Sequence, residues 1–594
     1  MLVRERGPEP RLPPAVWAAL GVALVILYIL AARGQPVGAI GDDSLNIMLA
    51  RSLRHGAFSW PDAHGTPSAD PLPGFAALLL LPVWIVEPRW DALRLIGLLS
   101  MPAALFFCWR LARRLLPFGA AVAVVWLTAL NPLLVGRAGF VLPDIPFLAL
   151  SLALFHALDA NPDRPGWMLA GLGAAAATLL RPYGFILALS LALLLWLRGG
   201  WRKAAGFFLV AVLPLAGWML RNRFSAGTWA GYVPHMGSQA ASLARPGAQF
   251  AHAGMMAAIF FGDGLLALGG LPLEGLMAAG IATVIIAGFG VVRLLRSQED
   301  PLTCVLGAYA IGLLALHSLW LAVAQRYVMP IMPIMWIFLA AAVQPLLRRR
   351  GAAVGALIAA ITILSFRADA ALLRSAWSAP PRYQGETMSW IRRQTPADAR
   401  FQSMEYVTLS LLAGRQTELP ALDAGASTRD AWLASSLSRK TDYLHVAADL
   451  KVDGYFPDPA KTLFANLARW ARSSPYLREV FRSPADGTVV FRFQHPDPAR
   501  YLRAWRAYEL AGLAVRSGAD KRMVRRKLQE AVRLEPTLAY AWAALSQYEY
   551  SPRARLRDLE TAAKADPASA VIRDGLAALR REQGPWLPSR APVR

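Results

Sequence analysis

The sequence has little cysteine and little charge for its length. Only two cysteines occur in 594 residues, Cys108 and Cys304, and both lie in apolar runs. This excludes a disulfide framework, and no Cys/His cluster has the spacing of a zinc site. Charged residues make up 17% of the chain, against roughly 25% in a soluble globular protein. Hydrophobic residues make up 56%, so the composition fits a lipid bilayer better than water.

Acidic residues are scarce relative to basic ones. The chain has 62 Lys and Arg against 39 Asp and Glu, which gives a formal net charge of +23. In a soluble protein this excess would indicate nucleic-acid binding. Here the basic residues lie between hydrophobic segments, a pattern typical of membrane proteins. We therefore expect membrane lipid, and no nucleic acid, among the partners of this chain.

Long apolar runs predict a polytopic α-helical membrane protein. A span needs about 20 apolar residues, whereas segment 74–87 has about 14 and should lie at the outer surface as an interfacial helix. Basic clusters mark cytoplasmic ends, among them the N-terminal arginines. Their alternation predicts about eleven spans, with the N-terminus inside and the C-terminus outside. The predicted spans are 14–33, 91–112, 118–136, 145–159, 166–181, 183–198, 204–220, 272–294, 302–323, 327–347 and 352–366.

The same pattern predicts three domains. Residues 1–370 should form the transmembrane domain, with two long outer loops at 34–87 and 221–270. Residues 371–496 should form a small extracytoplasmic α/β domain, because short β-like runs such as Tyr443–Val446 and Thr488–Phe493 alternate with helical stretches. Residues 497–594 should form a helical module that resembles tetratricopeptide (TPR) repeats. A helical hairpin cap is an equally open interpretation of that last segment.

The first outer loop carries the clearest candidate for chemistry. Residues 41–56, GDDSLNIMLARSLRHG, predict an amphipathic helix at the membrane surface that begins with Asp42 and Asp43. Adjacent helical residues point about 100° apart, so only one of these carboxylates should face a given cleft. Helix capping by aspartate is the simpler explanation of the pair.

The order of motifs resembles the GT-C superfamily of membrane glycosyltransferases, such as protein O-mannosyltransferases and lipid A aminoarabinose transferases. Its first outer loop commonly has an acid pair, an ARxLxxG stretch and a proline-rich segment. Here these read Asp42-Asp43, ARSLRHG at 50–56 and DPLP at 70–73. The lysine that many aminoarabinose-type members place before the prolines is absent. Asp70 stands near that point, so donor contacts made by that lysine do not carry over.

Three later segments extend the resemblance, which covers roughly residues 14–370 and the tail only loosely. Each would place a charged residue at the outer end of a span. They are 131–154 with Asp144, the RPxG-like junction 179–189 with Arg181, and the RYxxPxxP-like segment 325–336 with Arg326 and Tyr327.

The resemblance implies transfer of a sugar, a hexose or pentose, from a polyprenyl-phosphate donor to an acceptor hydroxyl, usually with inversion. It implies Asp42 as the general base, with Asp43 as the close alternative, and Asp144 as an aid to the base or the acceptor. A carboxylate in a low-dielectric cleft can take the hydroxyl proton. The acceptor stays open between a glycan, a lipid and a protein.

The negative charge of the leaving phosphate needs positively charged side chains to bind it. The resemblance implies that Arg326, with Arg181 and Tyr327, binds it through forked donors. Asp42 and Asp43 are also the candidates to hold Mg²⁺ or Mn²⁺, although no cofactor is required. The expected location is a bacterial inner membrane, with the C-terminal region in the periplasm.

Three alternatives stay open. A polysaccharide polymerase or ligase would also be polytopic with large outer loops. A transporter would favour internal repeats, and none is seen between the two halves. A non-catalytic membrane scaffold would act through a protein partner bound to the TPR-like tail.

Overall fold

The chain folds into two compact units, one with the described residues up to Gly385 and one with those from Glu386 onward. We call them the membrane unit and the C-terminal unit. The computed structural model describes residues 13–60, 65–160, 166–229, 246–298, 300–320, 323–378, 383–420, 428–447 and 467–582. The N-terminal arginines Arg4, Arg6 and Arg11, which belong to the topology prediction, lie outside these ranges.

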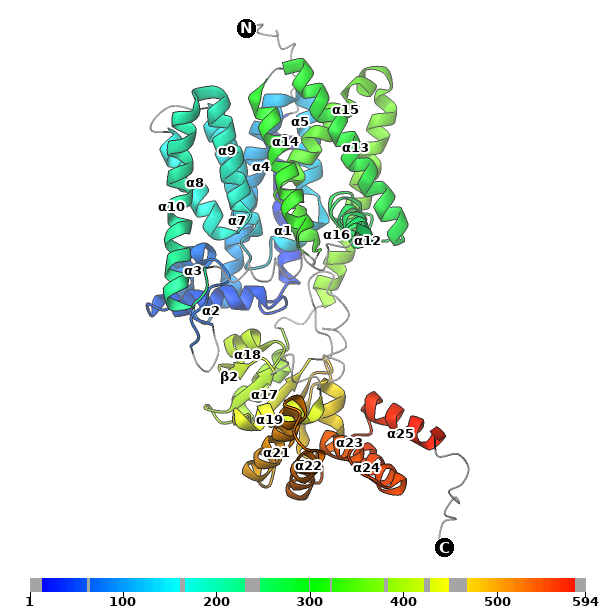
Figure 1. The fold of residues 1–594 in the computed structure, drawn as a ribbon. Coiled ribbons are helices and arrows are strands. Elements are labelled where there is room, and N and C mark those ends of the chain that lie inside the picture. The colour runs from blue at the N-terminus through cyan, green and yellow to red at the C-terminus, as the bar shows by residue number, and fades with distance from the viewer. Residues whose placement is uncertain are drawn as a thin grey trace. The chain divides into compact units, whose positions relative to one another are not determined.

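The regular secondary structure in the described part of the membrane unit is helical, apart from an isolated β-bridge between Ser59 and Pro67. Its long helices run side by side, and α2 lies across one end of the bundle (Figure 1). The helices are α1 (Pro14–Arg33), α2 (Asp42–Arg54), α3 (Pro73–Val86), α4 (Leu95–Leu115), α5 (Phe118–Ala129), α6 (Pro132–Arg137), α7 (Asp144–Ala160), α8 (Gly166–Leu180), α9 (Gly184–Gly199), α10 (Trp201–Ser225), α12 (Pro246–Met256), α13 (Leu273–Gln298), α14 (Pro301–Ser318), α15 (Met332–Arg349) and α16 (Gly351–Ser378), with 3₁₀ turns η1 (Trp90–Arg94) and η3 (Gln325–Val328) and the π-helix η2 (Ala257–Leu265).

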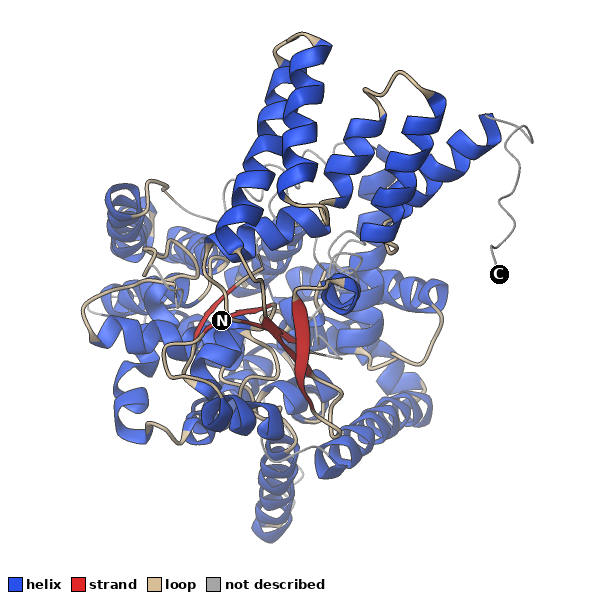
Figure 2. Ribbon diagram, turned by 90° about the horizontal axis from the view of Figure 1, so that it is seen from below, coloured by secondary structure: helices blue, strands red, loops and turns tan. Residues whose placement is uncertain are grey.

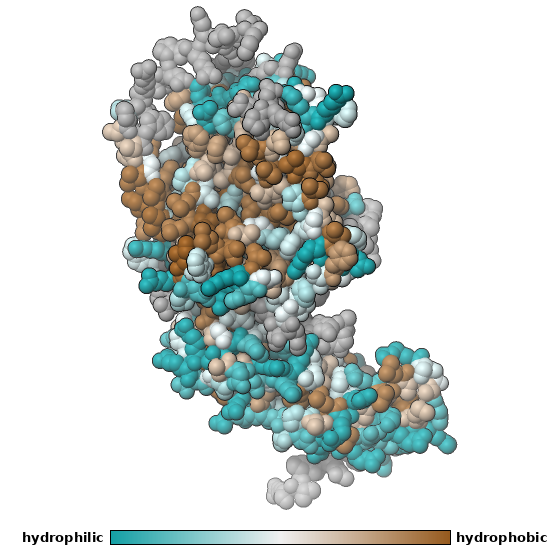
Figure 3. Space-filling view, turned by 90° about the vertical axis from the view of Figure 1, so that its left-hand side faces the viewer, coloured by the Kyte–Doolittle hydropathy of each residue, from teal (hydrophilic) through white to brown (hydrophobic). Residues whose placement is uncertain are grey.

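The membrane unit presents an apolar surface on the face shown in Figure 3. Hydrophobic side chains, brown in Figure 3, cover the middle of its visible face, and hydrophilic ones lie toward both ends. Among the described residues, five helices are long and apolar enough to cross a membrane: Trp90–Leu115, Trp201–Ser225, Leu273–Ser297, Pro301–Ser318 and Gly351–Arg374. Six further apolar helices are shorter, which fits a multi-pass membrane protein.

A helix lies at each of the eleven predicted spans, while the number that cross the bilayer stays a prediction. Segment 118–136 is divided, because the side chain of Asn131 accepts a hydrogen bond from the backbone N–H of Leu133 and Pro132 begins α6. Helix α3 fits the expected interfacial segment 74–87. Its 14 residues extend about 21 Å, well short of a hydrocarbon core of about 30 Å.

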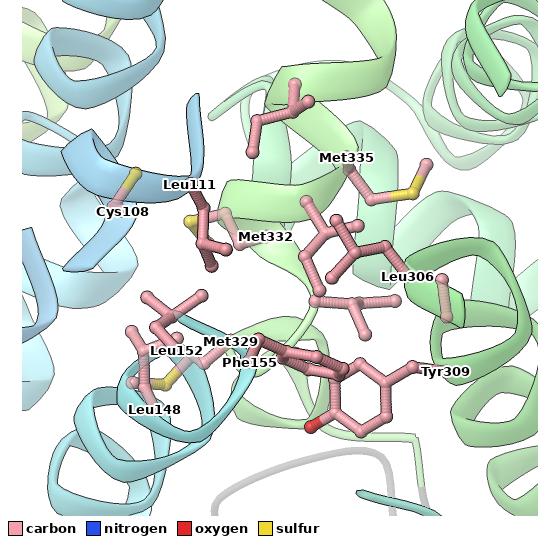
Figure 4. Packing of buried hydrophobic residues seen from close by; sticks show 14 of the residues in the cluster. Cys108, Leu111, Leu148, Leu152, Phe155, Leu306, Tyr309, Met329, Met332 and Met335 are labelled. Atoms are coloured by element: carbon pink, nitrogen blue, oxygen red, sulfur yellow. The ribbon is translucent and has the colours of Figure 1, made fainter. Parts of the chain in front are cut away.

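The core of the membrane unit joins α4, α7, α14 and α15. Cys108 and Leu111 of α4, Leu148, Leu152 and Phe155 of α7, and Leu306 and Tyr309 of α14 surround three methionines: Met329, which follows η3, and Met332 and Met335 of α15 (Figure 4). Small residues let backbones approach closely elsewhere in the bundle. A Cβ atom on Gly290 of α13 would collide with the carbonyl of Phe338 in α15.

Four charged residues fasten α4, α7, α9 and α14 at the end of the bundle opposite α2. They are Arg114, Asp159, Arg198 and Asp300, which we call the four-charge cluster. Arg114 Nη2 lies 2.7 Å from Asp300 Oδ2, and Arg198 Nη2 lies 2.5 Å from Asp159 Oδ1 and 3.1 Å from Asp300 Oδ1. Asp300 also caps α14 by accepting from the backbone N–H of Leu302.

The C-terminal unit contains a five-stranded mixed sheet, whose strands are red in Figure 2. The order is β2-β1-β3-β5-β4, with β1 parallel to β2 and β3, and β5 antiparallel to β3 and β4. The predicted strands at 443–446 and 488–493 are confirmed as β3 and β5. The elements are α17 (Gly385–Gln394), β1 (Arg400–Ser403), α18 (Tyr406–Ala413), β2 (Gln416–Glu418), α19 (Arg429–Ser438), β3 (Tyr443–Val446), β4 (Leu477–Arg482) and β5 (Val489–Phe493).

The helical segment that follows shares its core with the sheet. Trp432 of α19 and Phe491 of β5 belong to the same buried cluster as Tyr501, Leu528 and Leu545 of the helices. The helices are α21 (Pro498–Arg516), α22 (Lys521–Leu534), α23 (Ala539–Ser546), α24 (Pro552–Ala565) and α25 (Ala570–Glu582).

A buried arginine, Arg429, also links the sheet to the helices that follow it. The guanidinium of Arg429, at the start of α19, donates to the carbonyls of Thr537 and Ala565 and to the carboxylate of Asp430. The segments 371–496 and 497–594 are predicted from the sequence as separate domains. From Glu386 onward their described parts share one unit, whereas residues up to Ser378 belong to α16 of the membrane unit.

Candidate active site

The acid pair begins α2, but its two carboxylates serve different partners. Gly41 adopts a positive φ of 73°, which favours glycine, and turns the chain into the helix. Asp43 is fully buried, and its oxygens accept from the backbone N–H groups of Gly38 at 2.8 Å and Ser44 at 2.7 Å. Burial raises the pKa of Asp43 to about 6. The Asp43 carboxyl therefore holds the loop that leads into α2.

Asp42 instead faces η3, the turn that carries the RYxxPxxP-like segment. Its Oδ2 accepts a hydrogen bond of 2.8 Å from Arg326 Nη1, across 284 positions in the sequence. The Asp42 side chain is 45% exposed, whereas the Arg326 side chain is 10% exposed. The pair thus combines an accessible carboxylate with a buried, oriented guanidinium.

A second acid–arginine pair adjoins the first. Asp144, buried in the first turn of α7, accepts a bond of 2.5 Å from Arg181 Nη2, in the junction between α8 and α9. The charges of Arg326 and Asp42 also act on Arg181. Two carboxylates and two guanidiniums therefore form one electrostatic cluster.

Aromatic rings connect the two pairs. The His317 ring, near the end of α14, lies 4.8 Å from the Tyr327 ring and 5.6 Å from the Tyr183 ring, between ring centroids. Arg181 lies over the Tyr183 ring and Arg326 over the Tyr327 ring, 5.9 Å and 5.7 Å from the centroids. Arginines that stack on aromatic faces lose little entropy when they bind an anion.

Sequence reasoning selected Tyr327 but missed Tyr183 and His317. His317 Nδ1 lies 2.8 Å from the Leu313 carbonyl, which can only accept. Nδ1 therefore carries a proton, and in the neutral ring Nε2 is the acceptor nitrogen. An ionisable residue close to the end of an apolar span was the available signal for His317, and Tyr183 lay inside the RPxG-like junction itself.

Salt bridges and backbone contacts brace segment 34–87, the predicted first outer loop. Arg51, from the ARxLxxG-like stretch, lies 3.1 Å from Glu87 at the end of α3, and Arg54 lies 3.4 Å from the same carboxylate. Arg221 of α10 donates to the carbonyls of Ser68 and Phe58. These contacts tie α2, which carries Asp42, and the loop to the bundle.

The geometry gives little support to a cation held by the acid pair. Asp42 and Asp43 direct their oxygens to a guanidinium and to backbone N–H groups, respectively. Within the described ranges, no three His, Cys, Asp or Glu side chains come together as a set of metal ligands.

Comparison with solved structures identifies the fold. No protein-family model matches the sequence, and no curated protein matches it. The chain is similar to ArnT from Cupriavidus metallidurans bound to undecaprenyl phosphate, with a TM-score of 0.53 and 13% identity, over 82% of this chain and 100% of that chain. It is also similar to the Archaeoglobus fulgidus oligosaccharyltransferase in complex with Zn and sulfate, with a TM-score of 0.50 and 14% identity, over 88% and 85%. The chain therefore has the GT-C fold that these membrane glycosyltransferases share.

Proposed function

We propose that this chain is a membrane glycosyltransferase. It moves a sugar from a polyprenyl-phosphate donor to an acceptor hydroxyl at the outer face of a bacterial inner membrane. The observation that carries the proposal is the pairing of the half-exposed Asp42 with the buried Arg326, beside the Asp144–Arg181 pair. The GT-C fold supports the reaction class, and undecaprenyl phosphate in the ArnT structure supports the donor class.

The two arginines bind the donor phosphate. Each guanidinium presents several N–H donors in a fixed fork, which matches phosphate oxygens. In the unliganded site their charges are balanced by Asp42 and Asp144. When phosphate arrives, Arg326 exchanges the Asp42 carboxylate for a phosphate oxygen. The Tyr327 ring packs against the Arg326 guanidinium and supports it.

Asp42 then acts as the general base. Released from Arg326, its carboxylate takes the proton of the acceptor hydroxyl as the hydroxyl oxygen bonds to the anomeric carbon. The bond from that carbon to the phosphate oxygen breaks, and polyprenyl phosphate leaves with its charge held by the arginines. Attack opposite the leaving group inverts the anomeric centre. Asp144 stays paired with Arg181 and orients it, while Asp43 keeps the loop in place.

The test is an amide substitution at the base. Asp42→Asn keeps the size of the side chain but removes its proton affinity, so turnover should fall by a factor on the order of 10²–10⁴. The full chain would be reconstituted in nanodiscs, and release of undecaprenyl phosphate would be measured from a set of undecaprenyl-phosphate sugars. Binding of undecaprenyl phosphate should persist, because both arginines remain.

Asp43→Asn is the matched control, and we expect it to change stability more than turnover. Full activity in both single variants and in the double variant would end the glycosyltransferase proposal. Severe loss in both, with rescue by added Mn²⁺ or Mg²⁺, would point instead to a cation shared by the two acids.

A further inference from the structure

The π-helix η2 is a fixed platform within the second outer loop. π-Helices are rare and frequently occur at functional sites. Glycines place η2 directly on α13: a Cβ atom on Gly262 would lie 2.5 Å from the Leu276 carbonyl, and one on Gly280 would collide with the Ala257 carbonyl. These backbone contacts leave no room for η2 to slide along α13.

A buried amide fixes the other side of η2. Asn131, between α5 and α6, donates from Nδ2 to the carbonyls of Gly264 and Leu265, each at 3.0 Å. Its Oδ1 accepts from the backbone N–H of Leu133, so the amide orientation is set. The last residues of η2 are therefore anchored to the bundle.

From this platform one side chain reaches the turn that carries Arg326. Gln325 Nε2 donates a hydrogen bond to Asp263 Oδ2, and Gln325 is the residue immediately before Arg326. The backbone of η2 also packs on the same turn, since a Cβ atom on Gly264 would lie 3.1 Å from Val328 Cγ1. The Asp263–Gln325 bond thus links the platform to the first residue of η3.

We propose that Asp263 and Gln325 are positioning residues that hold η3 so that the Arg326 guanidinium faces the donor phosphate. This rests on the proposed function, in which Arg326 binds that phosphate. Asp263 acts through Gln325 and the η3 backbone, and no direct contact with the substrate is needed. Gln325 is adjacent to Arg326 in η3, so a loose Gln325 would let the guanidinium drift from its productive place.

The experiment measures binding of undecaprenyl phosphate to the full chain in nanodiscs. Asp263→Ala and Gln325→Ala should each weaken binding about tenfold, because one hydrogen bond to a charged group is lost. Arg326→Ala should weaken it at least as much. In the Arg326→Ala background, Asp263→Ala should cause no further loss, since its effect passes through Arg326.

A pair of compensating substitutions, one longer and one shorter by a methylene, controls for a general folding defect. Asp263→Glu and Gln325→Asn should each weaken binding, and the double variant should recover most of it, because the summed length of the two side chains is restored. A purely structural role for Asp263 predicts additive loss in the Arg326→Ala background and no recovery in the double variant.

The outcomes separate the two proposals. Wild-type binding in Asp263→Ala and Gln325→Ala, with weakened binding in Arg326→Ala, would overturn the positioning role and leave the proposed function intact. Additive loss in the Arg326→Ala background would also overturn it. Wild-type binding in Arg326→Ala would remove the phosphate role of Arg326 and thereby contradict the proposed donor site itself.

Discussion

The adjacent aspartates at the start of α2 have different partners, because successive side chains of a helix point about 100° apart. Asp43 points into the protein, where two backbone N–H groups donate to its oxygens, whereas the half-exposed Asp42 points to the buried Arg326. A buried carboxyl with backbone donors stabilises a loop, whereas an accessible carboxylate can exchange partners. The same sequence pair thus supplies both the support and the proposed base.

The raised pKa of Asp43 predicts a pH-dependent stability. The folded protein holds this proton up to a pH of about 6, whereas the unfolded chain releases it near 3.8. Stability from this group is therefore present below pH 4 and is lost as the pH rises toward 6, by roughly 3 kcal/mol in total. Thermal unfolding of the wild type and Asp43→Asn in detergent, from pH 4 to 8, measures it. The wild-type advantage should shrink with rising pH, and parallel curves would contradict the assignment.

At the scale of elements, α7, α9 and α14 each connect the candidate site to the four-charge cluster. Helix α7 runs from Asp144 to Asp159, about 22 Å along its axis, and α14 runs from Asp300 to His317, about 26 Å. One end of these helices carries the proposed chemistry, while the other end holds their mutual positions. Between the two ends, apolar residues of α7, α9 and α14 pack into the core of the membrane unit.

Removal of Asp300 should destabilise the protein and spare its chemistry. Asp300→Ala removes the cap of α14 and one partner of Arg114 and Arg198, at a cost of about 1–3 kcal/mol. We expect a lower Tm and an unchanged turnover per folded molecule. Asp300→Asn is the matched control, because asparagine caps nearly as well and removes only the charge. Loss of turnover at an unchanged Tm would show that the cluster communicates with the site.

At the scale of the whole molecule, the membrane unit contains every residue of the proposed site. The C-terminal unit is a sheet and a helical array with one core, joined through Arg429. Its TPR-like helices therefore do not stand apart from the sheet, and any partner or acceptor that they position is presented by the unit as a whole.

Two truncations test that unity. Removal of residues 497–594 takes away Thr537 and Ala565, so Arg429 loses two carbonyl partners and the sheet loses part of its core. We expect the remaining strands to become sensitive to protease. Truncation after Gly385 should instead leave a folded membrane unit that transfers sugar to a small surrogate acceptor. A protease-resistant product from the first truncation would contradict the shared core.

The membrane topology has its own test. A periplasmic reporter fused after Arg594 should be active, and one fused near Arg349 should be inactive, because basic clusters mark the cytoplasmic ends of spans. An inactive reporter after Arg594 would mean that the count of eleven spans is wrong, and segment 74–87 would be the first candidate for an extra span.

The sequence by itself determined the helices and the residue types of the site. Apolar runs place helices wherever a bilayer requires backbone hydrogen bonds to be satisfied within each segment, and Asp42, Asp144, Arg181 and Arg326 could be selected because charged residues at span ends are few. Only the tertiary structure decided their partners. Asp42 and Arg326 are 284 positions apart, and local periodicity carries no information about such distances. Burial then separated the surroundings of Asp42 and Asp43, and side-chain contacts added Asp263 and His317, because contact across helices depends on how the whole bundle closes.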